Sequence, residues 1–232
     1  MAGADVYLRM LQKAVIFDMD GLLIDSEPYW QEAGMETLSR FGIQLSVRQY
    51  HSSTGLRTIE WINHWFRHFN VDLVHAPEAI NAIEASAIEK IRLGGQPMPG
   101  ADHIMNFFIR KNYRIGLASS SPMKLIEVVV DKLGIRPYLH AMSSAGELAY
   151  GKPHPQVYLN CAEALNITPV HCVCFEDSFN GMIAAKAAKM KCVVVPFHEQ
   201  YNEAGWGAAD LKLRSLANFN ELLLEGIWAG KN

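Results

Sequence analysis

The sequence predicts an α/β fold: a doubly wound parallel sheet with a helical domain inserted into it. Short apolar runs of strand length alternate with helical patterns along most of the chain, which is typical of a parallel sheet covered by helices on both faces. Acidic and hydroxyl residues directly follow several of these runs, where open parallel sheets place their ligand sites. One long segment, residues 28–96, contains helical patterns but no strand-like run.

The composition restricts the class of protein. The 232 residues are 50% hydrophobic and 19% charged, with a formal net charge of −3. Such a chain can form one or two domains with a hydrophobic core of their own. No basic cluster resembles a nucleic-acid-binding surface, and no apolar run has the length of a signal peptide or a membrane span. We therefore expect a cytoplasmic protein that binds neither nucleic acid nor membranes.

The predicted sheet has five strands, which are connected by helices. The strands are expected at residues 14–17, 114–118, 141–143, 172–175 and 192–195, and the helices at 102–111, 122–133, 155–165 and 178–189. Right-handed crossovers place the carboxyl ends of all these strands at one edge. The first twelve residues precede the first strand and are expected to form a loose arm.

The inserted segment follows the first strand. Its helices are expected at residues 29–41, 46–51, 58–69 and 77–93, and the Gly- and Pro-rich residues 94–100 form the expected return linker and a hinge. The predicted domains are therefore a core of residues 1–27 and 97–232 and a cap of residues 28–96. A group of aromatic residues is expected to form the core of the cap, with Trp30 the one that faces a ligand: Tyr29, Trp30, Trp61, Trp65, Phe66 and Phe69.

The cysteines are expected to be free and buried. Three of the four lie inside or beside apolar strand-like segments, which favours buried thiols over disulfides or a zinc site. Cys172 and Cys174 share one face of a strand, but no further pair of Cys or His residues has the spacing of a zinc site.

Two carboxylates follow the first strand. Alternation along an extended chain directs Asp18 and Asp20 to the same side, with Met19 opposite. Buried acids at a strand end need a cation, and a divalent metal together with a phosphoryl group would account for both. One carboxylate can then bind metal and attack phosphorus while the other transfers a proton. The alternative is a surface turn, because Asp-x-Asp-Gly also occurs in loops and calcium sites.

Hydroxyl residues follow the second strand. Ser119, Ser120 and Ser121 precede a helix whose free N–H groups and partial positive charge favour an anion. We expect the Ser119 hydroxyl to bind a phosphoryl oxygen, with the N–H of Ser120 nearby. The alternative is that one of these serines only caps the helix, and we predict this role for Ser121, which lies directly before Pro122.

A lysine and two further acids follow the third and fourth strands. Lys152 lies in a Pro-rich turn before a helix and could bridge the attacking carboxylate and the phosphoryl oxygens as a compact charge. The neighbouring His154 is expected at the surface. Glu176 and Asp177 again need a cation, and hard oxygen ligands completed by water and phosphate describe Mg²⁺. Ser178 is expected to cap the helix that follows.

These motifs together resemble the haloacid dehalogenase superfamily. They are Asp18-Met19-Asp20-Gly21, Ser119, Lys152 and Glu176-Asp177, and the resemblance covers nearly the whole chain. The helical insert is similar to the cap of the β-phosphoglucomutase-like branch. Further stretches resemble the bacterial hexitol phosphatase and 2-deoxyglucose-6-phosphate phosphatase group within it: Asp25-Ser26-Glu27-Pro28, Gly116-Leu117-Ala118-Ser119, Lys152-Pro153-His154-Pro155-Gln156-Val157-Tyr158, Glu176-Asp177-Ser178 and Asn180-Gly181-Met182.

The resemblance implies a Rossmann-like core and a Mg²⁺-dependent phosphatase that acts on a small phosphorylated sugar or polyol. It implies that Asp18 is the nucleophile and a magnesium ligand, and that Asp20 gives its main-chain carbonyl to the metal and its side chain to proton transfer. Ser119 and Lys152 would hold the phosphoryl group, and Asp177 would ligate magnesium with Glu176 as its acidic partner. Members of the branch are often monomers, so we expect a monomer.

Residues for the rest of the substrate are expected in or near the cap. We assign Glu27, Trp30 and Arg57 to this role, whereas Ser120 is assigned to the phosphate site beside Ser119. For Arg57, the alternative is a solvated arginine at the start of a helix.

Other activities remain as alternatives. A β-phosphoglucomutase-type enzyme resembles this chain in its core, but such mutases have a histidine where this chain has Trp30, which favours hydrolysis. A dehalogenase would not place an acid at Asp20, and a phosphonate hydrolase would need a Schiff-base lysine in the cap, where Lys90 lies late, near the linker. A non-catalytic binding module would be expected to lack one of the motif acids, and none is missing.

Overall fold

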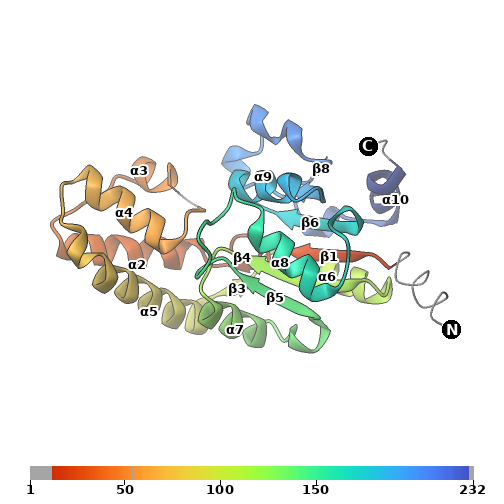
Figure 1. The fold of residues 1–232 in the computed structure, drawn as a ribbon, viewed down its shortest axis with the longest axis horizontal. Coiled ribbons are helices and arrows are strands. Elements are labelled where there is room, and N and C mark those ends of the chain that lie inside the picture. The colour runs from red at the N-terminus through yellow and green to blue at the C-terminus, as the bar shows by residue number, and fades with distance from the viewer. Residues whose placement is uncertain (1–11, 54, 230–232) are drawn as a thin grey trace.

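Six parallel strands form the central sheet of the protein. The computed structural model describes residues 12–53 and 55–229 (Figure 1). The strand order is β5-β4-β1-β6-β7-β8. The bounds are Ala14–Phe17 for β1, Arg114–Ser119 for β4, Ala141–Ser144 for β5, Cys172–Glu176 for β6, Lys191–Val194 for β7 and Leu211–Lys212 for β8. The five predicted strands are confirmed to within a residue or so, whereas β8 is too short to give a sequence pattern. Apart from residue 12, the expected N-terminal arm lies outside the described residues.

The register of the sheet brings the motif residues to one edge. Phe17 of β1 lies beside Leu117 of β4 and Phe175 of β6. Because these strands are parallel and in register, the residues that follow them leave the sheet at the same end. This places Asp18, Ser119 and Glu176 within one small region.

Side chains of the strands alternate between two apolar layers. Val15 and Phe17 pack in one hydrophobic cluster, and Ala14 and Ile16 pack in the other. The first layer is covered by α6, Ala101–Arg110, α7, Met123–Lys132, and α10, Glu221–Ala229. The second is covered by α8, Gln156–Leu165, and α9, Phe179–Ala187. This is the doubly wound sheet that the sequence predicted.

Four helices form the insertion between the first and second strands of the sheet. They are α2, Glu27–Arg40, α3, Val47–His51, α4, Thr58–His68, and α5, Ala76–Gly94. Figure 1 shows them in orange and gold beside the sheet, where α5 packs against α2 and α4 and also contacts α7 of the core. Short 3-10 helices lie at Leu73–His75, Arg136–Tyr138, Pro169–His171, His198–Gln200, Ala204–Ala208 and Leu216–Asn218.

The two chain passages between sheet and insertion are paired. β2, Ile24–Asp25, and β3, Gln96–Pro97, form an antiparallel ladder. Within the expected linker of residues 94–100, Gly94 is the last residue of α5, and Gln96 and Pro97 form β3. Two-residue strands leave no periodicity in a sequence, so the ladder could not be predicted.

The aromatic residues of the insertion are mostly buried. Trp61, Trp65 and Phe66 are buried, as predicted, whereas Phe69 lies at the edge and is 36% exposed. Tyr29 and Trp30 are half-buried against the same cluster. No helix in the described part of the chain has both the length and the hydrophobicity of a membrane span.

Candidate active site

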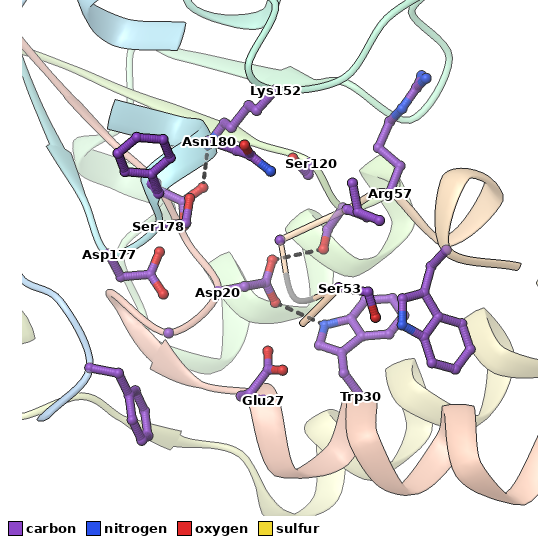
Figure 2. A pocket seen from close by; sticks show the side chains of 18 of the residues that line it. Asp20, Glu27, Trp30, Ser53, Arg57, Ser120, Lys152, Asp177, Ser178 and Asn180 are labelled. Atoms are coloured by element: carbon purple, nitrogen blue, oxygen red, sulfur yellow. Dashed lines mark hydrogen bonds and ion pairs between the residues drawn. The ribbon is translucent and has the colours of Figure 1, made fainter. Parts of the chain in front are cut away.

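A cavity of about 610 Å³ lies where the carboxyl ends of the strands meet the insertion (Figure 2). Its wall contains most of the residues that the sequence analysis selected: Asp18, Asp20, Glu27, Trp30, Arg57, Ser119, Ser120, Lys152 and Asp177. Of the selected set, only Glu176 is absent from the wall, and its side chain is fully buried behind it. The structure therefore brings together residues that lie up to 159 positions apart.

Lys152 is at the centre of a buried ion network. Its Nζ donates to Asp18 Oδ1 at 2.5 Å, to Glu176 Oε1 at 2.7 Å and to the carbonyl of Ala118 at 3.0 Å. Burial alone would lower the pKa of Lys152, but the charges of Asp18 and Glu176 outweigh it and raise the pKa. The ammonium group is therefore a fixed positive charge at the end of β1.

Glu176 positions this lysine. Its Oε1 accepts hydrogen bonds from Lys152 and from the Tyr158 hydroxyl, and its Oε2 accepts from the N–H and the hydroxyl of Ser178, at 3.3 and 3.1 Å. A Cβ at Gly181 would overlap this carboxylate, because it would lie 1.9 Å from Oε1. Glycine at 181 is thus needed for the carboxylate to fit.

The acids at the ends of β1 and β6 carry more negative charge than Lys152 neutralises. Carboxylate oxygens of Asp18, Glu176 and Asp177 lie within 4.8 Å of one another. Burial raises the pKa of Asp18 to about 8, against the Lys152 charge that lowers it. Burial, together with the charges of Asp18 and Glu176, also raises the pKa of Asp177. Such a cluster of hard oxygen donors fits a divalent cation such as Mg²⁺.

The oxygens open to a cation belong to the two aspartates. Neither Asp177 nor the second oxygen of Asp18 accepts a hydrogen bond from any residue in the described ranges, whereas both oxygens of Glu176 do. Gly21 keeps this space open: its φ is +73°, and a Cβ there would lie 2.3 Å from Asp177 Oδ2.

Asp20 accepts hydrogen bonds from both the core and the insertion. Its Oδ1 accepts from Ser26 Oγ at 2.7 Å and Trp30 Nε1 at 3.1 Å, and its Oδ2 accepts from Ser119 Oγ at 3.1 Å and Ser121 Oγ at 2.7 Å. Figure 2 shows Asp20 between the Trp30 indole and the core strands. The carboxylate is thus held in one orientation by four donors.

The serines after β4 differ from their predicted roles. The prediction that Ser121 caps a helix is wrong, because α7 begins at Met123 with Pro122 at the cap position, and the Ser121 hydroxyl donates to Asp20 instead. The Ser119 hydroxyl also donates to Asp20, so it must turn away to reach a phosphoryl oxygen. Ser178 does cap α9, as predicted, by accepting the N–H of Gly181 at 3.0 Å.

Arg57 connects the insertion to the core. Its Nη1 donates to the carbonyls of Ala145, at 3.1 Å, and Leu148, at 2.5 Å, and its Nη2 contacts Glu60 at 2.6 Å. Only 8% of its surface is exposed, so the alternative of a solvated arginine is wrong. In Figure 2 its side chain extends away from Asp20 and Glu27. The guanidinium therefore binds the backbone of the core loop that precedes α8.

Glu27 has an unpaired carboxylate oxygen. Its Oε1 is buried and has no hydrogen-bond partner among the residues that the structure describes. The Tyr50 hydroxyl contacts the same carboxylate. Burial, together with the charges of Asp20 and Asp25, raises the pKa of Glu27 to about 7.

Several contacts of the site were not found from the sequence. The roles of Tyr158, Ser26 and Tyr50 depend on side chains that meet only in the folded chain, and no spacing rule connects Tyr158 with Glu176. The motif stretches quoted above contain Ser26 and Tyr158, which was the only available signal.

The remaining predicted features lie outside the cavity. His154 is exposed, as expected, and packs against the Tyr150 ring. The four cysteines are free and buried, as expected. Lys90 forms ion pairs with Glu32 and Glu36 and does not line the cavity.

The comparisons with known proteins identify the family. Residues 12–189 match the family model "haloacid dehalogenase-like hydrolase". Hexitol phosphatase B of Escherichia coli is 40% identical over 204 residues, which cover 88% of this chain and 92% of that protein. The chain therefore belongs to the haloacid dehalogenase-like hydrolase family, and the resemblance found in its motifs is confirmed.

Solved structures support the same fold. The CbbY structure from Rhodobacter sphaeroides in complex with phosphate has a TM-score of 0.83 and 25% identity, covering 94% of this chain and 99% of that one. A β-phosphoglucomutase from Clostridium difficile has a TM-score of 0.83 at 23% identity, covering 94% and 98%, and supports the fold alone.

Proposed function

We propose that this protein is a Mg²⁺-dependent phosphoric monoester hydrolase that acts on a small phosphorylated sugar or polyol through an aspartyl-phosphate on Asp18. The observation that carries the proposal is the network of Lys152 with Asp18 and Glu176 at the floor of the cavity, beside the unpaired carboxylate of Asp177. Membership of a hydrolase family and 40% identity to a hexitol phosphatase support the reaction class.

The nucleophile is Asp18. An Oδ of Asp18 attacks phosphorus in line, the bond from phosphorus to the sugar oxygen breaks, and an aspartyl-phosphate forms. Lys152 offsets the repulsion between the phosphate dianion and the carboxylate, and the N-terminus of α7 beyond Ser119 and Ser120 adds partial positive charge. Asp18, Asp177 and the main-chain carbonyl of Asp20 would hold the magnesium ion, with Glu176 next to them. When bound, the ion neutralises charge on the phosphoryl oxygens.

Asp20 is the proton-transfer group. In its protonated form it gives its proton to the departing alkoxide, and it later takes a proton from the water that hydrolyses the aspartyl-phosphate. The negative charge of a bound phosphate favours that protonated form. The contact of Trp30 with Asp20 adds a group from the insertion to this step.

The insertion is proposed to act as a cap that covers the site and contacts the leaving group. Residues 28–96 would be the cap and residues 1–27 and 97–232 the core. Trp30, Trp61 and Glu27 line the cavity from this side and support a role in contacting substrate. The protein is proposed to work as a monomer in the cytoplasm.

The test is release of inorganic phosphate from sugar and hexitol phosphates with Mg²⁺ and with chelator. We expect selective release that the chelator abolishes, and at least a thousandfold loss of kcat in Asp18→Asn. Mass spectrometry of the wild type after rapid quench should show phosphate on the peptide that contains Asp18. Phosphate release by Asp18→Asn at near wild-type rate would contradict the mechanism, and isomerisation of β-glucose 1-phosphate without release would favour the mutase alternative.

A further inference from the structure

The acid Glu27 lies in a cavity that has little free positive charge. It is the first residue of α2, directly after the chain leaves the core, and its side chain lines the cavity. Figure 2 shows the Glu27 carboxylate directed from the helix into the cavity, close to Trp30 and on the side where Asp20 lies. Glu27 belongs to one of the stretches that carry the resemblance and was assigned to substrate binding, but the proposed chemistry uses its carboxylate in no step.

A hydrogen-bond donor on a ligand would stabilise the unpaired oxygen of Glu27. Burying a carboxylate oxygen without a partner costs free energy, and a ligand donor would remove this cost. The surrounding wall contains the aromatic rings of Trp30, Tyr50 and Trp61. Aromatic rings beside an unpaired acceptor oxygen suit a molecule with C–H faces and hydroxyl donors.

The cations of the cavity are already engaged. Among the described residues of its wall, only Lys152 and Arg57 are basic, against six acids: Asp18, Asp20, Glu27, Asp177, Glu199 and Glu203. Lys152 binds two carboxylates, and the two terminal nitrogens of Arg57 bind Glu60 and core carbonyls. The Arg57 Nε has no hydrogen-bond partner among the described residues, but it is buried against Gly151, where a Cβ would lie 2.7 Å from it. A second anionic group on the substrate would therefore find no basic side chain whose terminal nitrogens are unpaired, and on the insertion side of the cavity it would meet the Glu27 carboxylate.

We propose that Glu27 is a specificity residue that accepts hydrogen bonds from the hydroxyl groups of an uncharged leaving group and excludes substrates with a second anionic group. This inference rests on the proposed function, because it describes the leaving group of that reaction. Under this proposal, monophosphates of neutral sugars and polyols are substrates, whereas bisphosphates and phosphorylated sugar acids are excluded. Like charges brought together at an interface repel strongly, and such repulsion is a common source of selection against the wrong partner.

Two substrates that differ at one carbon test the proposal. Glucitol 6-phosphate ends in a hydroxymethyl group where 6-phosphogluconate has a carboxylate. We expect the wild type to prefer glucitol 6-phosphate by about a hundredfold in kcat/KM at about pH 8, where Glu27 is mostly ionised. Glu27→Gln removes the charge but keeps the shape, and should reduce this ratio by about tenfold or more.

Two further variants control the comparison. Glu27→Asp keeps the charge but withdraws the oxygen, so it should keep the preference while lowering kcat/KM for glucitol 6-phosphate. Glu163→Gln makes the same chemical change at an exposed position of α8. It should change neither the preference between the two substrates nor kcat/KM for glucitol 6-phosphate. An unchanged ratio in a folded Glu27→Gln protein would overturn the proposal, as would equal use of both substrates by the wild type.

Binding distinguishes a failure of this inference from a failure of the proposed function. Calorimetric titration of Asp18→Asn and of Asp18→Asn with Glu27→Gln, each with both compounds and Mg²⁺, measures the preference without turnover. If the wild type releases no phosphate from any compound, the proposed function fails, and the binding ratios still decide the role of Glu27. Stronger binding of glucitol 6-phosphate that depends on Glu27 supports the inference, and equal binding of the two compounds contradicts it.

Discussion

The indole Nε1 of Trp30 donates a hydrogen bond of 3.1 Å to Oδ1 of Asp20. Trp30 belongs to α2 of the insertion, and Asp20 follows the first strand of the sheet. The proposed proton-transfer group is therefore hydrogen-bonded to a side chain that belongs to the insertion. The core holds the other oxygen of Asp20 through Ser119 and Ser121. The orientation of Asp20 thus depends on how the insertion sits on the core.

Trp30→Phe should lower kcat more than it changes KM. The phenyl ring keeps most of the apolar contact but removes the N–H donor, so Asp20 loses one of its four hydrogen bonds. We expect about a threefold to thirtyfold loss in kcat for a sugar phosphate. Steady-state kinetics with a sugar phosphate measures kcat and KM separately and so tests this expectation.

Ser121→Ala is the matched control for this change, because it removes a 2.7 Å hydrogen bond to Asp20 from the core side. If insertion and core both orient Asp20, both variants should lower kcat more than they change KM. A Trp30→Phe protein that changes KM alone would show that Trp30 acts only through substrate contact.

Arg57→Ala should destabilise the attachment of the insertion. The change leaves the carbonyls of Ala145 and Leu148 without their charged donor, so we expect a loss of about 1–3 kcal/mol in the free energy of unfolding. Arg57→Lys should recover only part of it, since one ammonium group cannot reproduce the fork of the guanidinium. Hydrogen exchange of residues 145–149 should increase in both variants. Unchanged exchange there in Arg57→Ala would contradict the connecting role.

The half-buried acid Glu27 should make stability depend on pH. Burial raises its pKa to about 7, so the folded state holds a proton on Glu27 between about pH 4.5 and 7, where the unfolded state has lost it. The free energy of unfolding therefore falls as the pH rises from about 4.5 to about 7, because the folded state must then hold an ionised carboxylate that it disfavours. Above about pH 7 the loss is complete. Glu27→Gln should be more stable than the wild type by about 2 kcal/mol at about pH 8, and the difference should disappear at about pH 4.5.

Denaturant unfolding in chelator, at both pH values, measures this difference. Asp18 and Asp177 are present in both proteins, so their titration cancels to a first approximation. A Glu27→Gln protein that is less stable than the wild type at pH 8 would show that the ionised carboxylate is stabilised in the folded state.

The placement of the motif residues followed from the sequence because it depends on topology. Asp18, Ser119 and Asp177 each follow an apolar run, and parallel strands with right-handed crossovers bring such positions to one edge. The side-chain contacts could not be found in this way. Whether the Ser121 hydroxyl caps a helix or donates to Asp20 depends on the position of the first helical residue, which sequence reasoning places only to within a residue or two.

The contacts of Arg57 could not be predicted either, because they join residues far apart in the chain. Its partners are carbonyls about 90 residues further along the chain, and a carbonyl has no residue-type signal. The short strands β2, β3 and β8 were also not predicted, because two residues cannot display the alternation that identifies a strand.

Tyr158→Phe tests the contact between Tyr158 and Glu176, which the sequence did not reveal. The fully buried Tyr158 donates its hydroxyl to Glu176 Oε1, the oxygen that also accepts from Lys152, and the Lys152 ammonium lies 4.9 Å from the centre of the tyrosine ring. Without this donor, Glu176 attracts Lys152 more strongly and away from Asp18, so the phosphate should be held less well. We expect a loss of about 1–2 kcal/mol in stability and a fall in kcat of about tenfold.

The readout that separates positioning from packing is the affinity for inorganic phosphate, a product of the proposed reaction. Calorimetry with phosphate and Mg²⁺ should show weaker binding to Tyr158→Phe. The matched control is Tyr113→Phe, which removes the hydroxyl that accepts a hydrogen bond from Trp228 far from the cavity. It should reduce stability without changing phosphate affinity. Equal phosphate affinity in all three proteins would mean that Tyr158 only fills the layer between α8 and the sheet, and that Ala118 and Glu176 suffice to hold Lys152.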